Sequence, residues 1–148
     1  MYKHILIATD GSEFSVRALN SGLKLARDLG AAVTAVTVTE KWSALEIAAE
    51  VRLRVEQPIE HYERLAEAAA QCVLADATEA ARQMGMSINP AYVPSRPPAE
   101  GIVETAQRLD CDLIAMGSHG RRGLTTLMLG SVTNEVLATS RLPVLIIR

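Results

Sequence analysis

Short runs rich in Val, Ile, Leu and Thr alternate with segments of helical spacing along the whole chain of 148 residues. Several of these runs are apolar almost throughout, as in strands that are covered on both faces. The segments between them carry apolar residues three and four positions apart, as amphipathic helices do. Strands that alternate with helices predict an α/β fold with one open parallel sheet and helices on both faces. The predicted strands cover 4–9, 32–39, 87–93, 113–116 and 144–147.

The predicted helices begin and end at residues that suit helix termini. Ser12 precedes the first helix as a candidate N-cap, and Gly30 ends it. Pro58 suits the first turn of a long helix that Gly85 ends. Two shorter helices and a partly helical surface segment complete the pattern, at 100–109, 131–139 and 41–57 respectively.

The composition narrows the class of protein. No linker, repeat or low-complexity tract divides the chain, so we expect one domain over 1–148. The net charge is −2 and aromatic residues make up only 3% of the chain, which predicts no nucleic-acid partner. No apolar stretch approaches the roughly 20 residues that span a bilayer, which predicts no membrane partner.

The cysteines and the N-terminus predict the compartment. Cys72 and Cys111 form neither a close pair nor a metal-binding pattern, and we expect two buried or half-buried thiols. From Met1 the chain runs directly into an apolar strand, without the features of a secretion signal. These observations together predict a protein of the reducing cytoplasm.

The strongest functional signal is the spacing of glycines toward the C-terminus. Gly117 and Gly120 follow the fourth predicted strand, and Gly130 and Ser131 open the last helix. Glycines let the backbone approach a phosphate and adopt positive φ, while a helix N-terminus offers free N–H groups and a favourable dipole. This order predicts a nucleotide phosphate cradle, which we define as residues 117–120 and 130–133.

A carboxylate at the end of the first strand extends the candidate site. Ligands of open parallel sheets bind at the carboxyl ends of strands, where the strand order reverses. Asp10 follows the first predicted strand, and Gly117 ends the fourth. If these two strands are neighbours, Asp10 and the phosphate cradle share one crevice. Asp10 can then accept hydrogen bonds from ribose hydroxyls or hold Mg²⁺ through water.

These stretches resemble the universal stress proteins, and the resemblance extends over essentially the whole chain. It rests on the opening strand and turn at 5–12, the fourth strand and loop at 112–120, and the closing segments at 130–133 and 142–146. The glycine spacing is similar to that of the family's ATP-binding branch. The resemblance implies a Rossmann-like sheet of five parallel strands in the order 3-2-1-4-5, with strands 1 and 4 side by side.

The resemblance also implies roles for individual residues. Asp10 is expected to contact the ribose, Ala8 to lie near the nucleoside, and the backbone of Val38 to meet the adenine edge. Residues of the phosphate cradle and the adjacent arginine are expected to surround the phosphates; Arg122 is the alternative arginine. The full set of expected nucleotide-binding residues is Ala8, Asp10, Val38, Met116, Gly117, Ser118, Gly120, Arg121, Gly130, Ser131, Val132 and Thr133.

The leading hypothesis is an ATP-binding stress-response or signalling protein with an unidentified protein partner. ATP with Mg²⁺ is favoured over ADP, AMP or a cyclic nucleotide because the phosphate cradle offers more donors than one phosphate needs. The chain lacks the Gly-Lys-Ser/Thr sequence of a Walker A motif, so we expect at most slow ATP hydrolysis. His119 has no evident carboxylate partner, and we assign no catalytic residue and no protein ligand to a metal.

Two other classes of function stay open. A nucleotidyl-transferring enzyme on a related sheet needs a Ser-Gly-Gly loop or a His-x-Gly-His pair near the first loop, and the chain has neither. A nucleotide-free dimeric scaffold is the second alternative, because the strand at 144–147 lies at a sheet edge whose unpaired backbone groups can bind a second copy. The family resemblance also implies a homodimer through this strand, with or without nucleotide.

Overall fold

The computed structural model describes residues 1–121 and 128–148. Its strands form one parallel sheet in the order β3-β2-β1-β4-β5, which confirms the expected fold class and strand order. β1 pairs with β4 from Ile5 opposite Leu113 to Ile7 opposite Ala115, so the first and fourth strands are neighbours. The strands are β1 (His4–Ala8), β2 (Ala32–Val38), β3 (Asn89–Val93), β4 (Leu113–Gly117) and β5 (Val144–Ile147).

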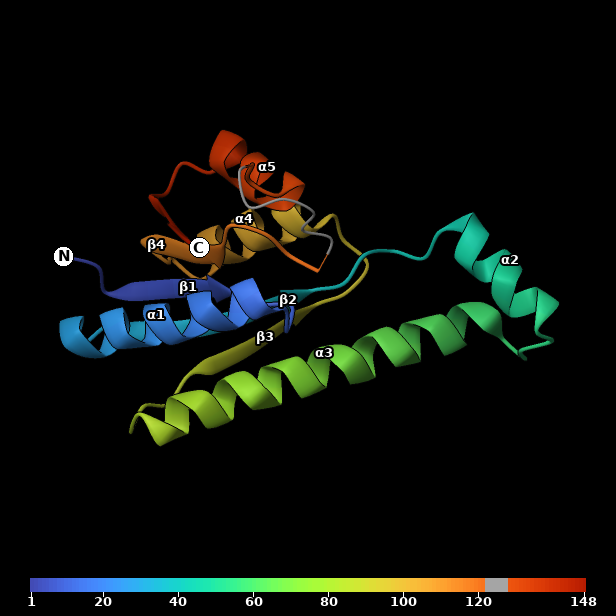
Figure 1. Ribbon diagram of the computed structural model, residues 1–148, viewed down its shortest axis with the longest axis horizontal. Helices are drawn as coiled ribbons and strands as arrows, with labels where there is room; N and C mark the ends of the chain where they lie inside the picture. The colour runs from blue at the N-terminus through green and yellow to red at the C-terminus, as the bar shows by residue number, and fades with distance from the viewer. Residues whose placement is uncertain (122–127) are drawn as a thin grey trace.

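Helices cover both faces of the sheet (Figure 1). One face is covered by α1 (Glu13–Leu29) and α3 (Pro58–Gln83), and the other by α4 (Pro98–Arg108) and α5 (Ser131–Thr139). A further helix, α2 (Ala44–Arg52), lies beside the N-terminal end of α3, away from the sheet.

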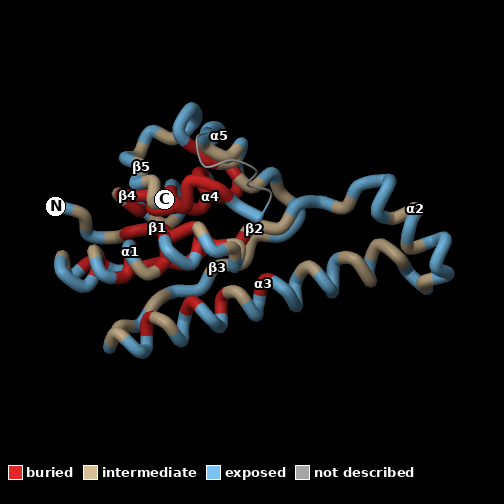
Figure 2. The backbone as a smooth tube through the Cα atoms, viewed as in Figure 1, coloured by how far each residue is buried: buried red, intermediate tan, exposed pale blue. Residues whose placement is uncertain are grey.

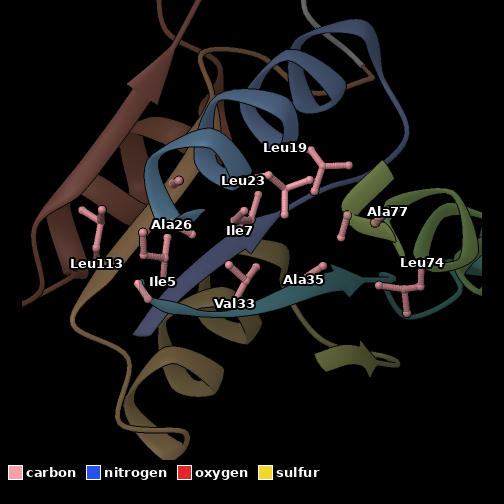
Figure 3. Close-up of a cluster of buried hydrophobic side chains, with 13 residues drawn as sticks. Ile5, Ile7, Leu19, Leu23, Ala26, Val33, Ala35, Leu74, Ala77 and Leu113 are labelled. Carbon is pink, nitrogen blue, oxygen red and sulfur yellow. The ribbon is translucent and has the colours of Figure 1, made fainter. Parts of the chain in front are cut away.

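The central strand β1 is buried on both of its faces. Ile5 and Ile7 point into the cluster that α1 and α3 cover, where Leu19 and Leu23 lie above them (Figure 3). Leu6 points into the opposite cluster, beneath α4 and α5. Full burial of such side chains contributes roughly 2 kcal/mol each. This two-sided packing holds the end of β1, and therefore Asp10, in a defined position beside β4.

The helix termini follow the local sequence signals. Ser12 caps α1, and its side chain accepts a hydrogen bond from the backbone N–H of Ser15. Gly30 ends the helix in the left-handed conformation, with φ of 65°. Pro58 opens α3 as expected, and α4 begins at Pro98, two residues earlier than the sequence predicted. Proline suits the first turn of a helix because the N–H that it lacks has no partner there.

The segment 41–57 contains a true helix, α2, which begins with a capping box. The Ser43 hydroxyl accepts from the Glu46 backbone N–H, and the Glu46 carboxylate accepts from the Ser43 backbone N–H at 2.8 Å. No residue of α2 is buried. The buried residues of α3 all lie between Ala70 and Ala81, so α2 and the first turns of α3 project beyond the sheet (Figure 2).

The two cysteines differ in their surroundings. Cys111 is buried as expected; its burial, together with the nearby carboxylates of Asp112 and Asp110, raises the pKa of its thiol to about 11. The expectation of burial is wrong for Cys72, which is exposed because it lies on the solvent side of α3 between the buried positions 70 and 74. In the part of the chain that the structure describes, none of the helices has the length and apolarity to cross a bilayer.

Candidate functional site

The carboxyl ends of β1, β2 and β4 open into one cavity of about 730 Å³. Cavities of this size are typical of small-molecule sites. The strand ends line its base, the start of α5 lies on one side, and the first half of α3 lies on the other. The expected binding residues that line it are Ala8, Asp10, Val38, Met116, Gly117, Gly120, Arg121, Gly130, Ser131, Val132 and Thr133.

Asp10 connects the end of β1 to the loop after β4. One carboxylate oxygen accepts from the backbone N–H of Ser12 at 2.9 Å, and the other accepts from the backbone N–H of Arg121 at 3.0 Å. The Arg121 side chain donates back from Nε to the Asp10 carbonyl at 2.8 Å. The crevice that the sequence predicted between strands 1 and 4 is therefore present, with Asp10 and Arg121 both at its wall. Arg122, the alternative arginine, lies outside the described residues.

The environment of Asp10 keeps its side chain ionised. Burial favours the neutral acid and so raises the pKa, but hydrogen bonds from Ser12, Ser15 and Arg121 stabilise the charged form. These bonds outweigh the burial, and the pKa of Asp10 lies below its ordinary value. At neutral pH the cavity therefore presents a carboxylate that can accept hydrogen bonds from a ligand.

The Asp10→Asn variant should lose stability at neutral pH, with a smaller loss in acid. The lowered pKa means that the ionised carboxylate stabilises the fold above the ordinary value of 3.8, and that this contribution disappears as the pH falls through the folded-state pKa. The stability difference between wild type and variant should be constant above about pH 5 and shrink below it. Urea unfolding from pH 2 to 7 measures this difference in stability. The matched control is Asp76→Asn, at an exposed position of α3. A difference independent of pH would contradict the assignment.

The glycines of the phosphate cradle are required by close packing. Among the described residues, positive φ is confined to other glycines and four non-glycine residues, so no glycine of the cradle has positive φ. A Cβ on Gly117 would lie 2.8 Å from the Phe14 carbonyl carbon, and one on Gly120 would lie 2.8 Å from Asp10 Oδ2. A Cβ on Gly130 would lie 3.3 Å from the backbone of the loop after β4. Glycine here lets α1, Asp10 and α5 converge on that loop.

The start of α5 supplies hydrogen-bond donors at the cavity. Gly130 is the N-cap residue, and within the described structure no side chain caps the helix and no acidic residue stands in its first turn. The Gly130 N–H donates to the carbonyl of Ser118 at 2.7 Å, and the Thr133 hydroxyl donates to the carbonyl of Gly117 at 3.0 Å. These two bonds fix the helix start against the loop. The first-turn N–H groups and the positive end of the dipole suit an anionic ligand.

Comparison with known proteins agrees with this architecture. The model of the universal stress protein family matches residues 1–148. The chain belongs to this family. Universal stress protein MJ0531 of Methanocaldococcus jannaschii is 32% identical over 148 residues, which are 100% of this chain and 83% of that protein.

Solved structures show the same fold. MJ0577 of Methanocaldococcus jannaschii matches with a TM-score of 0.79 at 30% identity, over 99% of this chain and 96% of that one. A universal stress protein solved in complex with cAMP matches with a TM-score of 0.71 at 25% identity, over 99% and 97% of the two chains. The cavity of this family member therefore lies in a fold that holds an adenine nucleotide in at least one relative.

Ser118 is the one expected binding residue outside the described wall of the cavity. It is only 1% exposed, and its backbone N–H donates to the carbonyl of Ile147 at 2.8 Å. Its carbonyl accepts from Gly130, and its hydroxyl lies 3.0 Å from Nδ1 of His119. Ser118 therefore joins β4, β5 and the start of α5 behind the cavity surface.

The sequence did not predict the wall that α3 and its neighbours form. A helix of 26 residues is about 39 Å long, whereas the 7-residue strand β2 spans about 23 Å. About two-fifths of the length of α3 therefore exceeds that of the strand. This mismatch in length is the signal that could have placed the helix at the site. The additional residues of the wall include Thr37, Thr39, Glu40, Glu46, Tyr62, Leu65, Ala66, Ala69, Ile102, His119 and Leu129.

Proposed function

We propose that this universal stress protein binds ATP in the cavity at the carboxyl ends of β1 and β4. The observation that carries the proposal is the convergence of three groups on that cavity: the Asp10 carboxylate, the loop of Gly117 and Gly120, and the uncapped start of α5. The phosphates lie on the cradle and beside Arg121, the ribose lies near Asp10, and the adenine lies toward Val38. The relative solved with cAMP supports an adenine nucleotide.

The cavity is complementary to a charged phosphate chain. Backbone N–H groups at the start of α5 and the guanidinium of Arg121 favour phosphate oxygens. These donors exceed what a single phosphate needs, which favours a triphosphate. Mg²⁺ would be held mainly by the nucleotide's phosphates and by water, because this ion retains much of its hydration shell. The ionised Asp10 can contact that ion through water.

The proposed activity is binding, with at most slow hydrolysis. The described wall of the cavity includes Arg121 and no lysine, so phosphoryl transfer lacks the lysine clamp of the P-loop enzymes. Each tenfold of rate requires about 1.4 kcal/mol of transition-state stabilisation, and fast turnover needs many such increments. We infer a cytoplasmic signalling module in which bound ATP alters the surface presented to a protein partner.

Analysis of the ligand that copurifies with the protein tests the proposal. The protein is purified without added nucleotide and denatured, and the released small molecules are separated by chromatography with mass detection. In parallel, calorimetric titration with ATP, ADP and AMP in the presence of Mg²⁺ measures the affinity for each nucleotide. Recovered ATP, or micromolar binding, supports the proposal. A protein that is empty and binds none of the three contradicts it and favours the nucleotide-free scaffold.

We also propose a homodimer through β5, because this strand lies at the edge of the sheet. The carbonyls of Pro143 and Ile147 accept hydrogen bonds from β4 and from the residue after it. Backbone groups alternate in direction along a strand, so the N–H and C=O of Val144 and Ile146 point away from β4. A second copy of β5 can pair with these groups.

Ile146→Pro should convert the dimer to monomer without breaking the sheet. The variant removes the N–H that points away from β4 and leaves the hydrogen bonds to β4 in place. Sedimentation velocity across a range of protein concentrations measures the change. Ile146→Val, which keeps the N–H and a β-branched side chain, is the matched control and should remain dimeric. An unchanged dimer in the proline variant would rule out pairing at this edge.

A further inference from the structure

The helix α2 belongs to the cavity wall, although it is not packed into the body of the protein. None of its residues is buried, and it packs principally against α3, at the end of that helix that lies away from the sheet (Figure 1). Glu46 of α2 nevertheless lines the cavity, and so does Glu40 in the segment that leads to this helix. A change in the position of α2 would therefore change the shape of the cavity.

The segment that carries α2 is attached firmly at both of its ends. At the end of β2, the Thr39 N–H donates to the Val93 carbonyl at 3.0 Å, and the Thr39 carbonyl accepts from the Arg96 N–H at 3.1 Å. At the other end, α3 is held on the sheet by its buried residues, which begin at Ala70. The stretch 40–57 can therefore change its position while the sheet stays intact.

The backbone that connects α2 to α3 does not by itself favour the observed position of α2. Arg54 has φ of 55° and Gln57 has φ of 51°. This left-handed region is disfavoured for residues that carry a Cβ. Such conformations persist where neighbouring contacts hold them. The position of α2 therefore depends on the contacts that it makes with α3.

A hydrogen-bonded pair of side chains joins the two helices. The Glu50 carboxylate accepts from Nδ1 of His61 at 2.8 Å. The side chains of Glu50 and His61 are only 22% and 33% exposed, so the pair is partly shielded from water and salt. One turn earlier on α2, the Glu46 carboxylate lies 3.5 Å from the Tyr62 hydroxyl, and both of these residues line the cavity. The pair therefore lies next to the wall residues and holds the helices that carry them together.

We propose that α2 is an adjustable wall of the nucleotide cavity, and that Glu50 and His61 are the positioning residues that hold it in the observed position, which we call closed. The inference rests on the proposed function and names a regulation of the same site. The base is proposed to lie toward Val38, the last residue of β2, and the adjustable stretch begins two residues later. A nucleoside that contacts this stretch binds the closed arrangement better and so increases its population.

The adjustable wall gives nucleotide binding an effect on the outer surface. α2 and its last turn carry Leu45 and Leu53, whose exposed fractions are both 77%. These side chains move with the helix. The position of the wall therefore determines where they are presented, as the proposed signalling function requires.

Titrations with ATP and with tripolyphosphate test the positioning pair. Glu50→Ala removes the acceptor and should weaken ATP binding about threefold, because only the closed fraction of the protein then offers the complete site. Tripolyphosphate, which needs the phosphate cradle alone, should bind equally to both proteins. His61→Lys keeps a donor for Glu50 and should bind ATP like wild type. The double variant Glu50→Ala/His61→Ala should bind ATP no more weakly than Glu50→Ala, as expected for two residues that act as a pair.

Glu67→Ala is the matched control for the loss of one negative charge. It lies at an exposed position of α3 outside the described wall of the cavity and should leave both affinities unchanged.

Amide hydrogen exchange tests the movement of the wall separately. In the ligand-free protein the amides of α2 should exchange faster than those of α1, because no residue of α2 is buried. Saturating ATP should slow the exchange of α2 at least about tenfold, since the open arrangement then becomes rare, whereas tripolyphosphate should not slow it. Glu50→Ala should speed the exchange of α2 in the ligand-free protein.

The two measurements separate this inference from the proposed function. If wild type does not bind ATP, the proposed function and the adjustable wall both fail. If wild type binds ATP, but Glu50→Ala matches its affinity or ATP leaves the exchange of α2 unchanged, this inference alone is overturned.

Discussion

Ser131→Asp should abolish measurable ATP binding while the protein stays folded. Ser131 is the exposed first residue of α5 and lines the cavity where the phosphates are proposed to lie. A carboxylate there places negative charge against the phosphate chain, and like charges in contact cost several kcal/mol. That corresponds to at least about a hundredfold in affinity. An acidic residue in the first turn favours the helix dipole, so the substitution does not disfavour α5 itself.

Calorimetry with ATP and thermal unfolding together measure this effect. Ser87→Asp makes the same substitution at an exposed position before β3, at the opposite end of the sheet, and should bind ATP like wild type. Ser131→Ala removes the hydroxyl without adding charge and should weaken binding only severalfold. Full ATP affinity in Ser131→Asp would mean that the phosphates lie elsewhere. A lowered unfolding temperature of Ser131→Asp would mean that the variant loses ATP binding because its fold is destabilised.

Gly117→Ala should lower the free energy of unfolding by about 3 kcal/mol. The new Cβ would lie 2.8 Å from the carbonyl carbon and 2.9 Å from the carbonyl oxygen of Phe14, which are backbone atoms of α1. Neither side can move easily, because α1 packs on the buried core and β4 pairs with both β1 and β5. The added methyl must therefore displace a helix or a central strand.

Urea unfolding of Gly117→Ala beside Gly85→Ala separates close packing from backbone conformation. Gly85 has φ of 73°, but a Cβ there would meet nothing within 4 Å. Its replacement should cost about 1 kcal/mol, through backbone strain alone. A loss at Gly117 no larger than that at Gly85 would show that α1 and β4 can separate at little cost, which contradicts the packing argument.

The helix boundaries show what local sequence predicts well. Ser12 as N-cap, Gly30 as terminator and Pro58 as the opening of α3 are all confirmed, because a cap depends on backbone and side-chain groups within a few residues. The double-sided burial of β1 is likewise confirmed from its continuous apolar run. The strand order was expected from the family resemblance, and the pairing of β1 with β4 confirms it.

The site was predictable in its polar motif and unpredictable in its remaining walls. The spacing of the glycines in the sequence predicted the loop after β4 and the start of α5 as parts of the site. Both segments line the cavity. Glu46 lies in the segment that the sequence predicted as a partly helical surface segment, and Tyr62 lies in the long predicted helix that Pro58 opens. They reach the cavity only because α3 runs past the ends of the strands. That placement depends on the packing of its C-terminal half, which lies many residues away.

By itself the sequence determined the alternation of strands and helices, the helix termini and the glycine spacing after β4 and before α5, since each depends on residues close together along the chain. Only the tertiary structure shows that close packing excludes a Cβ at the glycines of the motif, and which distant residues contact the loop. Asp10 accepts a hydrogen bond from Arg121, 111 positions away, and the backbone of Phe14 leaves no room for a Cβ at Gly117. Such contacts depend on how two packed layers bring distant segments together, and no local pattern encodes the distance between them.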